Sequence, residues 1–348
     1  MMEKKKIIFI VNPISGTQSK DTIVELIKKH LDKEKYDFDI IPTQFAGHAI
    51  ELAAIAAAEN VFMVVAIGGD GTVNEVGRSL IHTNTALGII PCGSGNGLAR
   101  HLQIPMDPKK AIDIINEGVT SCIDYGTINS IPFFCTCGVG FDAFVSMKFA
   151  ESGRRGLLTY LENMLHESLK YKPETYNIEL CDGNEVKTLK AYLIACANAS
   201  QYGNNAYIAP QASLHDGLID VTVLEPFTVL DVPALSFQLF NRTLDQNSRI
   251  KTFRCRKLRI HRAKEGVIHF DGDPIMAGKD LDVQVVPKAL NIIVNSNKKR
   301  KIKKPESLLQ IVSDYFVEVN TLRNNIQTRN KRWLELNRKL LRRKLSKK

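Results

Sequence analysis

The sequence has no apolar run near the ~20 residues that a membrane-spanning helix needs, and its N-terminal KKKIIFIV is too short for the apolar region of a signal peptide. None of its seven cysteines form a C-x-x-C pair. Cys135 and Cys137 alternate along an expected strand, which is typical of reduced, buried side chains and not of disulfides or zinc ligands. We therefore expect a cytoplasmic protein without a cysteine-bound metal.

Common nucleotide- and nucleic-acid-binding motifs are also missing. There is no G-x-x-x-x-G-K-[ST] phosphate loop, and no G-x-G-x-x-G opens the first strand–helix unit. The chain has no helix-turn-helix or zinc-finger pattern, and its body lacks the interleaving of aromatics with Lys and Arg that stacks bases. A nucleic-acid partner is disfavoured, and any phosphate site must have another design.

The excess of positive charge is concentrated at the end of the chain. Residues 298–348 hold 17 of the 47 Lys and Arg but only four of the 37 Asp and Glu, while the net charge of the whole chain is +10. Such a segment can contact nucleic acid or an anionic membrane, or it can be a solvated helix surface. Apolar residues recur at helical spacing from Val312 to Ile326. We expect a basic helical extension, with residues 329–348 as a candidate membrane contact.

At 348 residues, the chain is long enough for two domains. Its first part alternates apolar runs (7–11, 37–43, 61–67, 86–91) with helical patterns (19–31, 47–59, 72–81, 97–102, 109–118). This alternation predicts a parallel sheet covered on both faces, with ligands at the carboxyl ends of the strands. Asp107 and Pro108 supply an N-cap and a first-turn proline for the last helix.

After about residue 119, short alternating or apolar runs predict an antiparallel sandwich or barrel. The runs are 121–128, 132–139, 175–181, 190–198, 217–224, 253–262, 267–273, 281–287 and 290–296. Helical patterns interrupt them at 156–171 and 229–240. We place the domain boundary near Ser130, giving an α/β nucleotide-binding domain (1–129), a β-sandwich acceptor domain (130–297) and the helical extension (298–348).

Three glycine-rich turns follow predicted parallel strands: NPISG (12–16), GGDGTVNE (68–75) and PCGSGNGLAR (91–100). Glycines let a ligand approach the backbone, and a helix that begins near Thr72 would direct free N–H groups at a phosphate. Asp70 adds a negative charge there, which suits a metal or a transferred proton. The alternative is a tight strand-to-helix turn with Asp70 as N-cap. Two such turns on neighbouring crossovers favour the phosphate site.

Two acidic turns lie in the second half, LHDGLID (214–220) and HFDGDP (269–274). Asp-Gly is a strong hairpin signal, so a hairpin explains each turn taken singly. A carboxylate with neighbouring backbone carbonyls can also hold Mg²⁺. An Asp beside a substrate hydroxyl can take its proton in phosphoryl transfer.

Together the motifs NP-x-SG, GGDGTVNE, P-x-GSGN, N-x-x-x-YG with a following AP, DG-x-x-D and FDGD, in this order, resemble the diacylglycerol kinase catalytic-domain family, which includes bacterial lipid kinases and sphingosine kinases. The resemblance covers residues 7 to about 296. It implies an N-terminal α/β domain with an NAD kinase-like parallel sheet and a C-terminal antiparallel β-sandwich. ATP and Mg²⁺ would bind in the cleft between them, with a lipid hydroxyl as acceptor.

The resemblance also implies roles for individual residues. Nucleotide contacts map onto Asn12, Pro13, Ser15, Gly16, Thr43, Gly68, Gly69, Asp70, Gly71, Thr72, Asn74, Gly93 and Ser94. A structural Mg²⁺ maps onto the carboxylate of Asp216 and the carbonyls of Ser213 and Leu218, and Asp70 would face Mg²⁺ or its waters. The proton acceptor lies in the FDGD turn, where Asp273 stands at the position usually occupied by Glu. This departure leaves both Asp271 and Asp273 as candidates.

Four further residues have two interpretations each. His48 is either an ordinary helix-terminus residue or part of the nucleotide site near Thr43. For Asn198, Tyr202 and Asn204, a structural strand-to-loop turn is favoured over a role at the cleft.

The leading hypothesis is an ATP-dependent lipid kinase that associates peripherally with the membrane holding its acceptor. One alternative is an NAD kinase-like phosphotransferase acting on a soluble acceptor, and another is a nucleotide-binding regulator without catalysis. The four acids Asp70, Asp216, Asp271 and Asp273 argue against the regulator. Which lipid is the acceptor, diacylglycerol or a sphingoid type, stays open, as does a homodimer.

Overall fold

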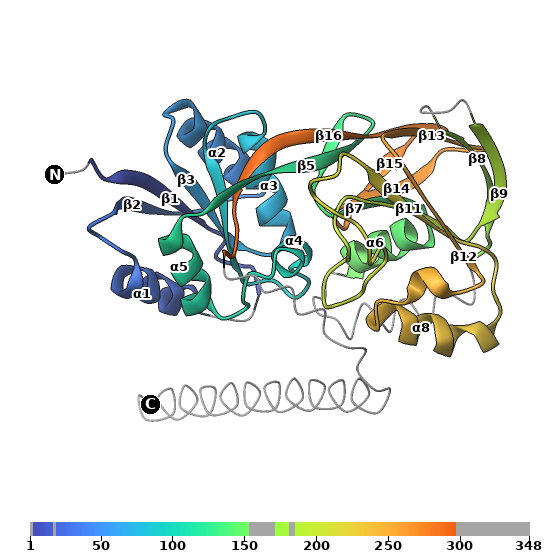
Figure 1. Cartoon of the computed structure of the whole chain (residues 1–348), viewed down its shortest axis with the longest axis horizontal. Coiled ribbons are helices and arrows are strands. Elements are labelled where there is room, and N and C mark those ends of the chain that lie inside the picture. Colours follow the sequence, from blue (N-terminus) through green and yellow to red (C-terminus); the bar gives the residue numbers. More distant parts are fainter. Residues whose placement is uncertain (1–2, 17–18, 153–170, 181–184, 297–348) are drawn as a thin grey trace, which may run out of the picture. The chain divides into compact units, whose positions relative to one another are not determined.

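The computed structural model describes residues 3–16, 19–152, 171–180 and 185–296, and the structural statements below concern these residues (Figure 1). The chain divides into a large unit, Met1–Arg300, and a second unit, Lys301–Lys348. The second unit, and all but the last residue of the helix predicted over 156–171, lie outside the described residues. The helical extension therefore stays a prediction.

The first lobe is built on a parallel sheet, as the alternation of strands and helices predicts. Its strands β1 (Lys5–Val11), β2 (Tyr36–Pro42), β3 (Met63–Gly68) and β4 (Ala86–Pro91) lie in the order β2-β1-β3-β4. The helices are α1 (Lys20–His30), α2 (His48–Ala58), α3 (Asp70–Leu80), α4 (Gly97–His101) and α5 (Pro108–Glu117). Helices α1 and α5 contact each other, and so do α2 and α3, so the two pairs cover the sheet (Figure 1).

Local signals explain where these helices begin and end. The side chain of Asp107 accepts a hydrogen bond from the N–H of Lys110 at 3.0 Å, Pro108 is the first residue of α5, and Gly118 ends the helix at φ +64. The predicted cap is therefore confirmed. Helix α3 begins at Asp70, two residues before Thr72, with Gly69 as its N-cap.

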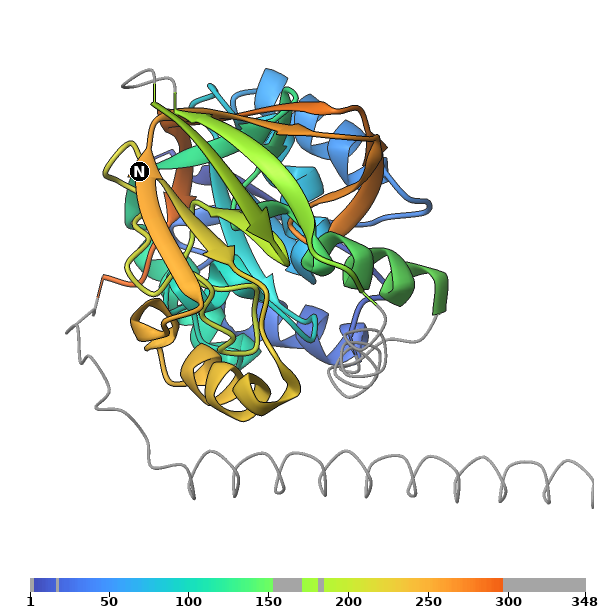
Figure 2. The ribbon, with the colours of Figure 1, turned by 90° about the vertical axis from the view of Figure 1, so that its right-hand side faces the viewer.

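The second lobe is an antiparallel sandwich, as predicted. One sheet has the order β12-β11-β10-β7-β14-β15. Its strands are β7 (Thr136–Gly140), β10 (Leu193–Ala197), β11 (Ile219–Leu224), β12 (Ile250–Cys255), β14 (Gly266–Phe270) and β15 (Asp273–Ala277). The facing layer contains β8 (Glu174–Leu180), β9 (Glu185–Ala191) and β13 (Lys257–Arg262), with β8 and β9 nearest the viewer in Figure 2. Side chains of both layers form one buried core.

The remaining elements connect the lobes or flank the sandwich. Strand β5 (Thr120–Ile128) pairs with the short β6 (Ile131–Phe133) and with β16 (Asp280–Ile293). Helix α6 (Phe141–Ser152) follows β7 directly. Helix α8 (Val232–Phe240) lies between two 3₁₀ turns, Val229–Asp231 and Leu244–Gln246, which confirms the helical pattern predicted there.

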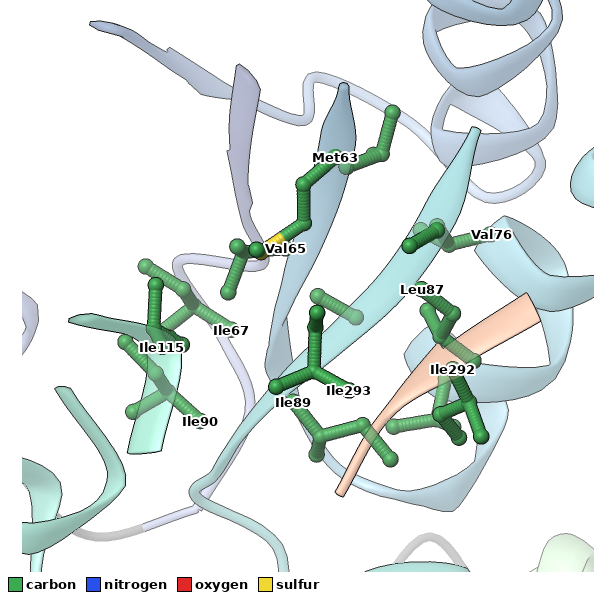
Figure 3. Close-up of a cluster of buried hydrophobic side chains, with 14 of the residues drawn as sticks. Met63, Val65, Ile67, Val76, Leu87, Ile89, Ile90, Ile115, Ile292 and Ile293 are labelled. Atoms are coloured by element: carbon green, nitrogen blue, oxygen red, sulfur yellow. The ribbon is translucent and has the colours of Figure 1, made fainter. Parts of the chain in front are cut away.

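Strand β16 belongs to both lobes. The sequence predicts two strands, 281–287 and 290–296, but the structure has a single strand with an irregular register between Val286 and Leu290. Leu281 lies in the core of the sandwich, whereas Leu290 and Ile292 lie in the core of the first lobe. Figure 3 shows Ile292 beside Leu87 of β4, its parallel partner. The end of the range predicted for the second domain therefore completes the first sheet.

The described cysteines are all free, and Cys135 and Cys137 are buried, as predicted. No helix among the described residues is long and apolar enough to cross a membrane.

Because β16 carries core side chains of both lobes, we expect Leu281→Ala and Leu290→Ala each to lower the free energy of unfolding by about 2–5 kcal/mol. Both side chains are fully buried. Gln284, exposed on the same strand, is the matched control, and Gln284→Ala should change the value by about 0.5 kcal/mol or less. Urea unfolding followed by circular dichroism measures all three. If Leu290→Ala lowers the free energy of unfolding no more than Gln284→Ala does, the conclusion that β16 contributes to the cores of both lobes is wrong.

Candidate active site

The first predicted turn is tied to the other two at the carboxyl ends of the parallel strands. Asn12 Nδ2 donates a hydrogen bond to Thr72 Oγ1 at 3.0 Å. Gly16, at φ +63, lies so close to the third turn that a Cβ would be 1.7 Å from the carbonyl oxygen of Cys92. Only a residue without a side chain fits this position.

The second and third turns pack backbone against backbone. A Cβ on Gly93 would lie 2.6 Å from the Cα of Gly69, and a Cβ on Gly95 would lie 2.6 Å from Asp70 Oδ2. Thr43 lies beside the same edge, because its N–H bonds to the carbonyl oxygen of Val11 at 2.8 Å. The structure thus brings together the segments in which the nucleotide contacts were predicted.

Asp70 joins the second turn to helix α4. Its Oδ2 accepts the N–H of Asn96 at 2.8 Å, and its Oδ1 accepts the N–H of Gly97 at 2.7 Å. Burial raises the pKa of Asp70 to about 6, while these two backbone donors act in the opposite direction. Asp70 is the first residue of α3, but its carboxylate accepts hydrogen bonds from backbone N–H groups at the start of α4. Its negative charge is therefore directed at those donors.

Gly71 differs from the neighbouring glycines. A Cβ added there would meet nothing within 4 Å, and its φ is not in the left-handed region. Gly71 lies in the first turn of α3, where N–H groups have no partner within the helix. Packing does not explain this glycine, whereas an approaching anion would.

Asp271 links the acidic turn to the first lobe. Its Oδ2 accepts hydrogen bonds from Asn74 Nδ2 and from the N–H of Phe134, both at 2.8 Å. Its Oδ1 accepts the N–H groups of Cys135 at 2.7 Å and Thr136 at 3.1 Å. Burial raises the pKa of Asp271 and these donors oppose the rise. The carboxylate is fixed by four donors from two segments.

Asp273, two residues later, is exposed at the start of β15, and none of the described residues hydrogen-bonds to its carboxylate. Its pKa is raised, mainly because nearby protein atoms displace water and also because of the charge of Asp271. The charge of Arg78 on α3 opposes this rise, and that of Glu75 adds to it. Of the two candidate bases, Asp273 is therefore the one whose carboxylate is open to a ligand.

The other acidic turn is anchored by a residue that the sequence reading overlooked. Asp124 of β5, 1% exposed, accepts the N–H of Gly217 and the N–H of Lys288, both at 2.8 Å. An Asp inside an otherwise apolar strand was the available signal. Within the turn, Asp216 Oδ1 accepts the N–H of Leu218 at 3.2 Å.

The carboxylate of Asp216 lies near the guanidinium group of Arg254 and near a second carboxylate, that of Asp220, which pairs with Arg254 at 2.8 Å. Asp216 Oδ2 has a distant contact with Arg254, at 3.7 Å, and the buried Oδ2 of Asp220 has no hydrogen-bond partner among the described residues. Within the same described part of the chain, no group of three or more His, Cys, Asp and Glu could hold a metal. Mg²⁺ commonly takes one or two carboxylates and keeps several waters. The donor types of Asp216 and of the carbonyls of Ser213 and Leu218 are of this kind, and the site stays a prediction.

A buried polar network lies next to the acidic turn. Asp142 Oδ2 lies 3.0 Å from His269 Nε2 and accepts the hydroxyl of Tyr202 at 3.1 Å. Neither Asp142 nor His269 was singled out from the sequence. Asn198 is fully buried and donates to the carbonyl oxygens of Asp124 and Phe134 at 3.0 Å, which is the favoured structural role.

His48 is the first residue of α2. Its Nδ1 accepts the N–H of Gln44 at 3.1 Å, and its ring stacks on Phe45 with centroids 4.6 Å apart. These contacts are those of a helix-terminus residue.

Comparison with known proteins agrees with this arrangement. The family model of the diacylglycerol kinase catalytic domain matches residues 6–128, and that of the YegS C-terminal NAD kinase beta sandwich-like domain matches residues 135–294. A diacylglycerol kinase of Mycobacterium tuberculosis is 30% identical over 300 residues, which cover 83% of this chain and 94% of that protein. One of Bacillus subtilis is 27% identical over 289 residues, 78% of this chain and 90% of that protein.

A solved structure of a diacylglycerol kinase from Bacillus anthracis has a TM-score of 0.67 at 19% identity, covering 85% of this chain and 99% of that one. This likeness supports the fold. The two family models together span both lobes, and the Mycobacterium relative matches along nearly its whole length. The chain therefore belongs to the diacylglycerol kinase catalytic-domain family and is a lipid kinase.

Proposed function

We propose that this kinase transfers the γ-phosphoryl group of ATP to the hydroxyl of a diacylglycerol or sphingoid-type lipid, with Mg²⁺ and with Asp273 as general base. The observation that carries the proposal is the bond from Asn74 on α3 to Asp271. It sets the acidic turn beside the helix whose first turn follows the glycines. A phosphate at the start of α3 and a hydroxyl at Asp273 would then approach each other from the two lobes.

The nucleotide would bind at the three turns of the first lobe. The predicted contacts at 12–16, Thr43, 68–74 and 93–94 lie along one edge of the sheet, at the carboxyl ends of its strands. Backbone N–H groups and the partial positive charge of a helix N-terminus stabilise phosphate there.

In the reaction, the lipid oxygen bonds to the γ-phosphorus and its proton passes to the carboxylate of Asp273. The bond from the γ-phosphorus to the bridging oxygen breaks, and ADP leaves. A general base contributes about 10²–10⁴-fold to such a step, and positioning with charge neutralisation supplies most of the rest. Asp271 is the poorer base because its lone pairs already accept four hydrogen bonds.

Two groups of residues would serve Mg²⁺. Asp216 with the carbonyls of Ser213 and Leu218 would hold a structural ion, which Asp124 supports by fixing the turn. Asp70 would face a second ion through water, because each of its oxygens accepts one N–H bond and keeps a further lone pair. A bound Mg²⁺ neutralises the negative charge of the phosphate oxygens.

The glycine turn can be tested at the position where packing does not require glycine. We expect Gly71→Val to weaken ATP binding at least about tenfold, because losing a charge-assisted hydrogen bond costs about 1.5–3 kcal/mol. Gly278→Val is the matched control, since a Cβ on Gly278 also meets nothing within 4 Å. Titration calorimetry measures affinity, and thermal unfolding checks that both variants fold. Equal ATP affinity in the two folded variants would show that the nucleotide does not bind at the first turn of α3.

The base and the acceptor are tested together by transfer of radiolabelled phosphate from ATP to vesicles holding diacylglycerol or a sphingoid base, with NAD as a soluble acceptor. We expect label in lipid and none in NAD. Asp273→Asn should lower kcat about 10²–10⁴-fold with ATP affinity nearly unchanged. Asp113→Asn, on the exposed face of α5, should have no effect.

Asp271→Asn should differ from Asp273→Asn in kind. Its amide NH2 group would replace one oxygen and face two of the four existing donors, so we expect a lower midpoint of thermal unfolding as well as lower activity. Since the pKa of Asp273 is raised, kcat should fall with decreasing pH above the usual carboxyl range near ~4. Full activity of Asp273→Asn, with a folded but inactive Asp271→Asn, would assign the proton transfer to Asp271.

Access to a lipid acceptor requires contact with the membrane. We propose that residues 329–348, with ten Lys and Arg and one acid, supply it electrostatically. Each basic residue near an anionic surface contributes about 1 kcal/mol. Truncation after Arg329 should reduce sedimentation with anionic vesicles and slow turnover on vesicle-borne lipid, while activity on detergent-dispersed lipid stays the same. Equal vesicle binding by both chains at low salt would reject this role.

A further inference from the structure

Lys20 is the first residue of helix α1, four residues after the end of the NPISG turn. Its side chain extends toward the third glycine turn, where the positive charge acts on the thiol of Cys92. Cys92 is a meeting point of all three turns, because its N–H bonds to the carbonyl oxygen of Gly68 at 2.8 Å and its own carbonyl oxygen lies against Gly16. The ammonium group therefore reaches the place where the three turns converge.

This ammonium group is buried without compensation. Nζ is shielded from solvent and takes part in no ion pair among the described residues, and the polar group beside it is the Cys92 thiol. The Cys92 thiol does not neutralise it: burial raises the pKa of the thiol, and the opposing effect of Lys20 is smaller. A buried charge without a partner is unfavourable, so the structure as it stands lacks an anion at this position.

The nearby carboxylate cannot supply that charge. Asp70 directs both oxygens at the N–H groups of Asn96 and Gly97. The first turn of α3 presents backbone N–H groups and a partial positive charge at the same edge of the sheet. These donors together with the ammonium group of Lys20 fit a ligand with several anionic oxygens.

We propose that Lys20 binds a phosphate group of the nucleotide, which rests on the nucleotide placement proposed above. The sequence has no phosphate-loop lysine of the G-x-x-x-x-G-K-[ST] type. Lys20 supplies the equivalent point charge from the start of α1 and reaches the glycine turns from the side of NPISG. Lysine commonly binds phosphate in this way. The ligand class is an oligophosphate, either free or attached to a nucleoside.

The experiment compares Lys20→Met, which keeps the length of the side chain and removes its charge, with Lys29→Met on the exposed face of the same helix. Titration calorimetry with tripolyphosphate, ATP and adenosine measures affinity. We expect Lys20→Met to weaken tripolyphosphate and ATP by about 10- to 100-fold, with adenosine unchanged. Lys29→Met should behave as the wild type. Weaker binding of both tripolyphosphate and ATP, with adenosine unchanged, supports a phosphate contact at Lys20.

The thermal midpoint without ligand is a second measurement. Removing an unpaired buried charge should leave the midpoint unchanged or raise it, whereas removing a structural lysine should lower it. If Lys20→Met does not fold, two other variants replace it: Lys20→Arg, which keeps the charge, and Lys20→Gln, which removes it. Lys20→Arg should then bind tripolyphosphate more tightly than Lys20→Gln. Unchanged tripolyphosphate affinity in a folded, uncharged variant overturns the proposal. Failure of phosphate transfer to any lipid, with tripolyphosphate binding still dependent on position 20, would reject the proposed function and keep this inference.

Discussion

The geometry of the site depends on one enclosed carboxylate, Asp271. A charged carboxylate taken out of water is stable only when hydrogen bonds replace its hydration, and Asp271 receives four. Three come from consecutive backbone N–H groups at 134–136 and one from Asn74 of α3. Asp271 also lies in the turn between β14 and β15, where its φ is +47. Its bond to Asn74 therefore fixes the turn that carries Asp273 relative to α3. Asp271 is therefore an anchor between the two lobes at the point where the chemistry is proposed.

The glycines of the site have two physical roles, and the structure separates them. Most are explained by packing between turns: a Cβ on Gly93 would lie 2.6 Å from the Cα of Gly69, and one on Gly203 would lie 2.8 Å from Gly95. These contacts let three loops and the 202–203 turn approach backbone to backbone. Gly71 has no such neighbour. A glycine motif is therefore evidence for a ligand only at positions where the protein itself leaves space.

Much of the architecture could be predicted because it is encoded locally. Apolar periodicity gave the strands and helices of the first lobe, and Asp107 with Pro108 gave the start of α5. Strand β16 was divided in two because Pro287 and Lys288 interrupt its pattern, and Lys288 does have φ +49. The anchors were not predictable, since Asp271 and Asn74 are 197 residues apart. Local periodicity does not record which distant segment a buried carboxylate will meet.

The three acids near the proposed phosphate would repel it if all of them faced it. Two do not act in this way, because Asp70 and Asp271 direct their oxygens at backbone or amide donors. Their charge is balanced locally, and the groups left for an anion are the first turn of α3 and the ammonium group of Lys20. Asp273 alone keeps an exposed carboxylate without a hydrogen-bond partner among the described residues. Hydrogen-bond donors occupy the oxygens of Asp70 and Asp271, which makes room for an anion between the acids. The same donors leave Asp273 as the acid that can accept a proton.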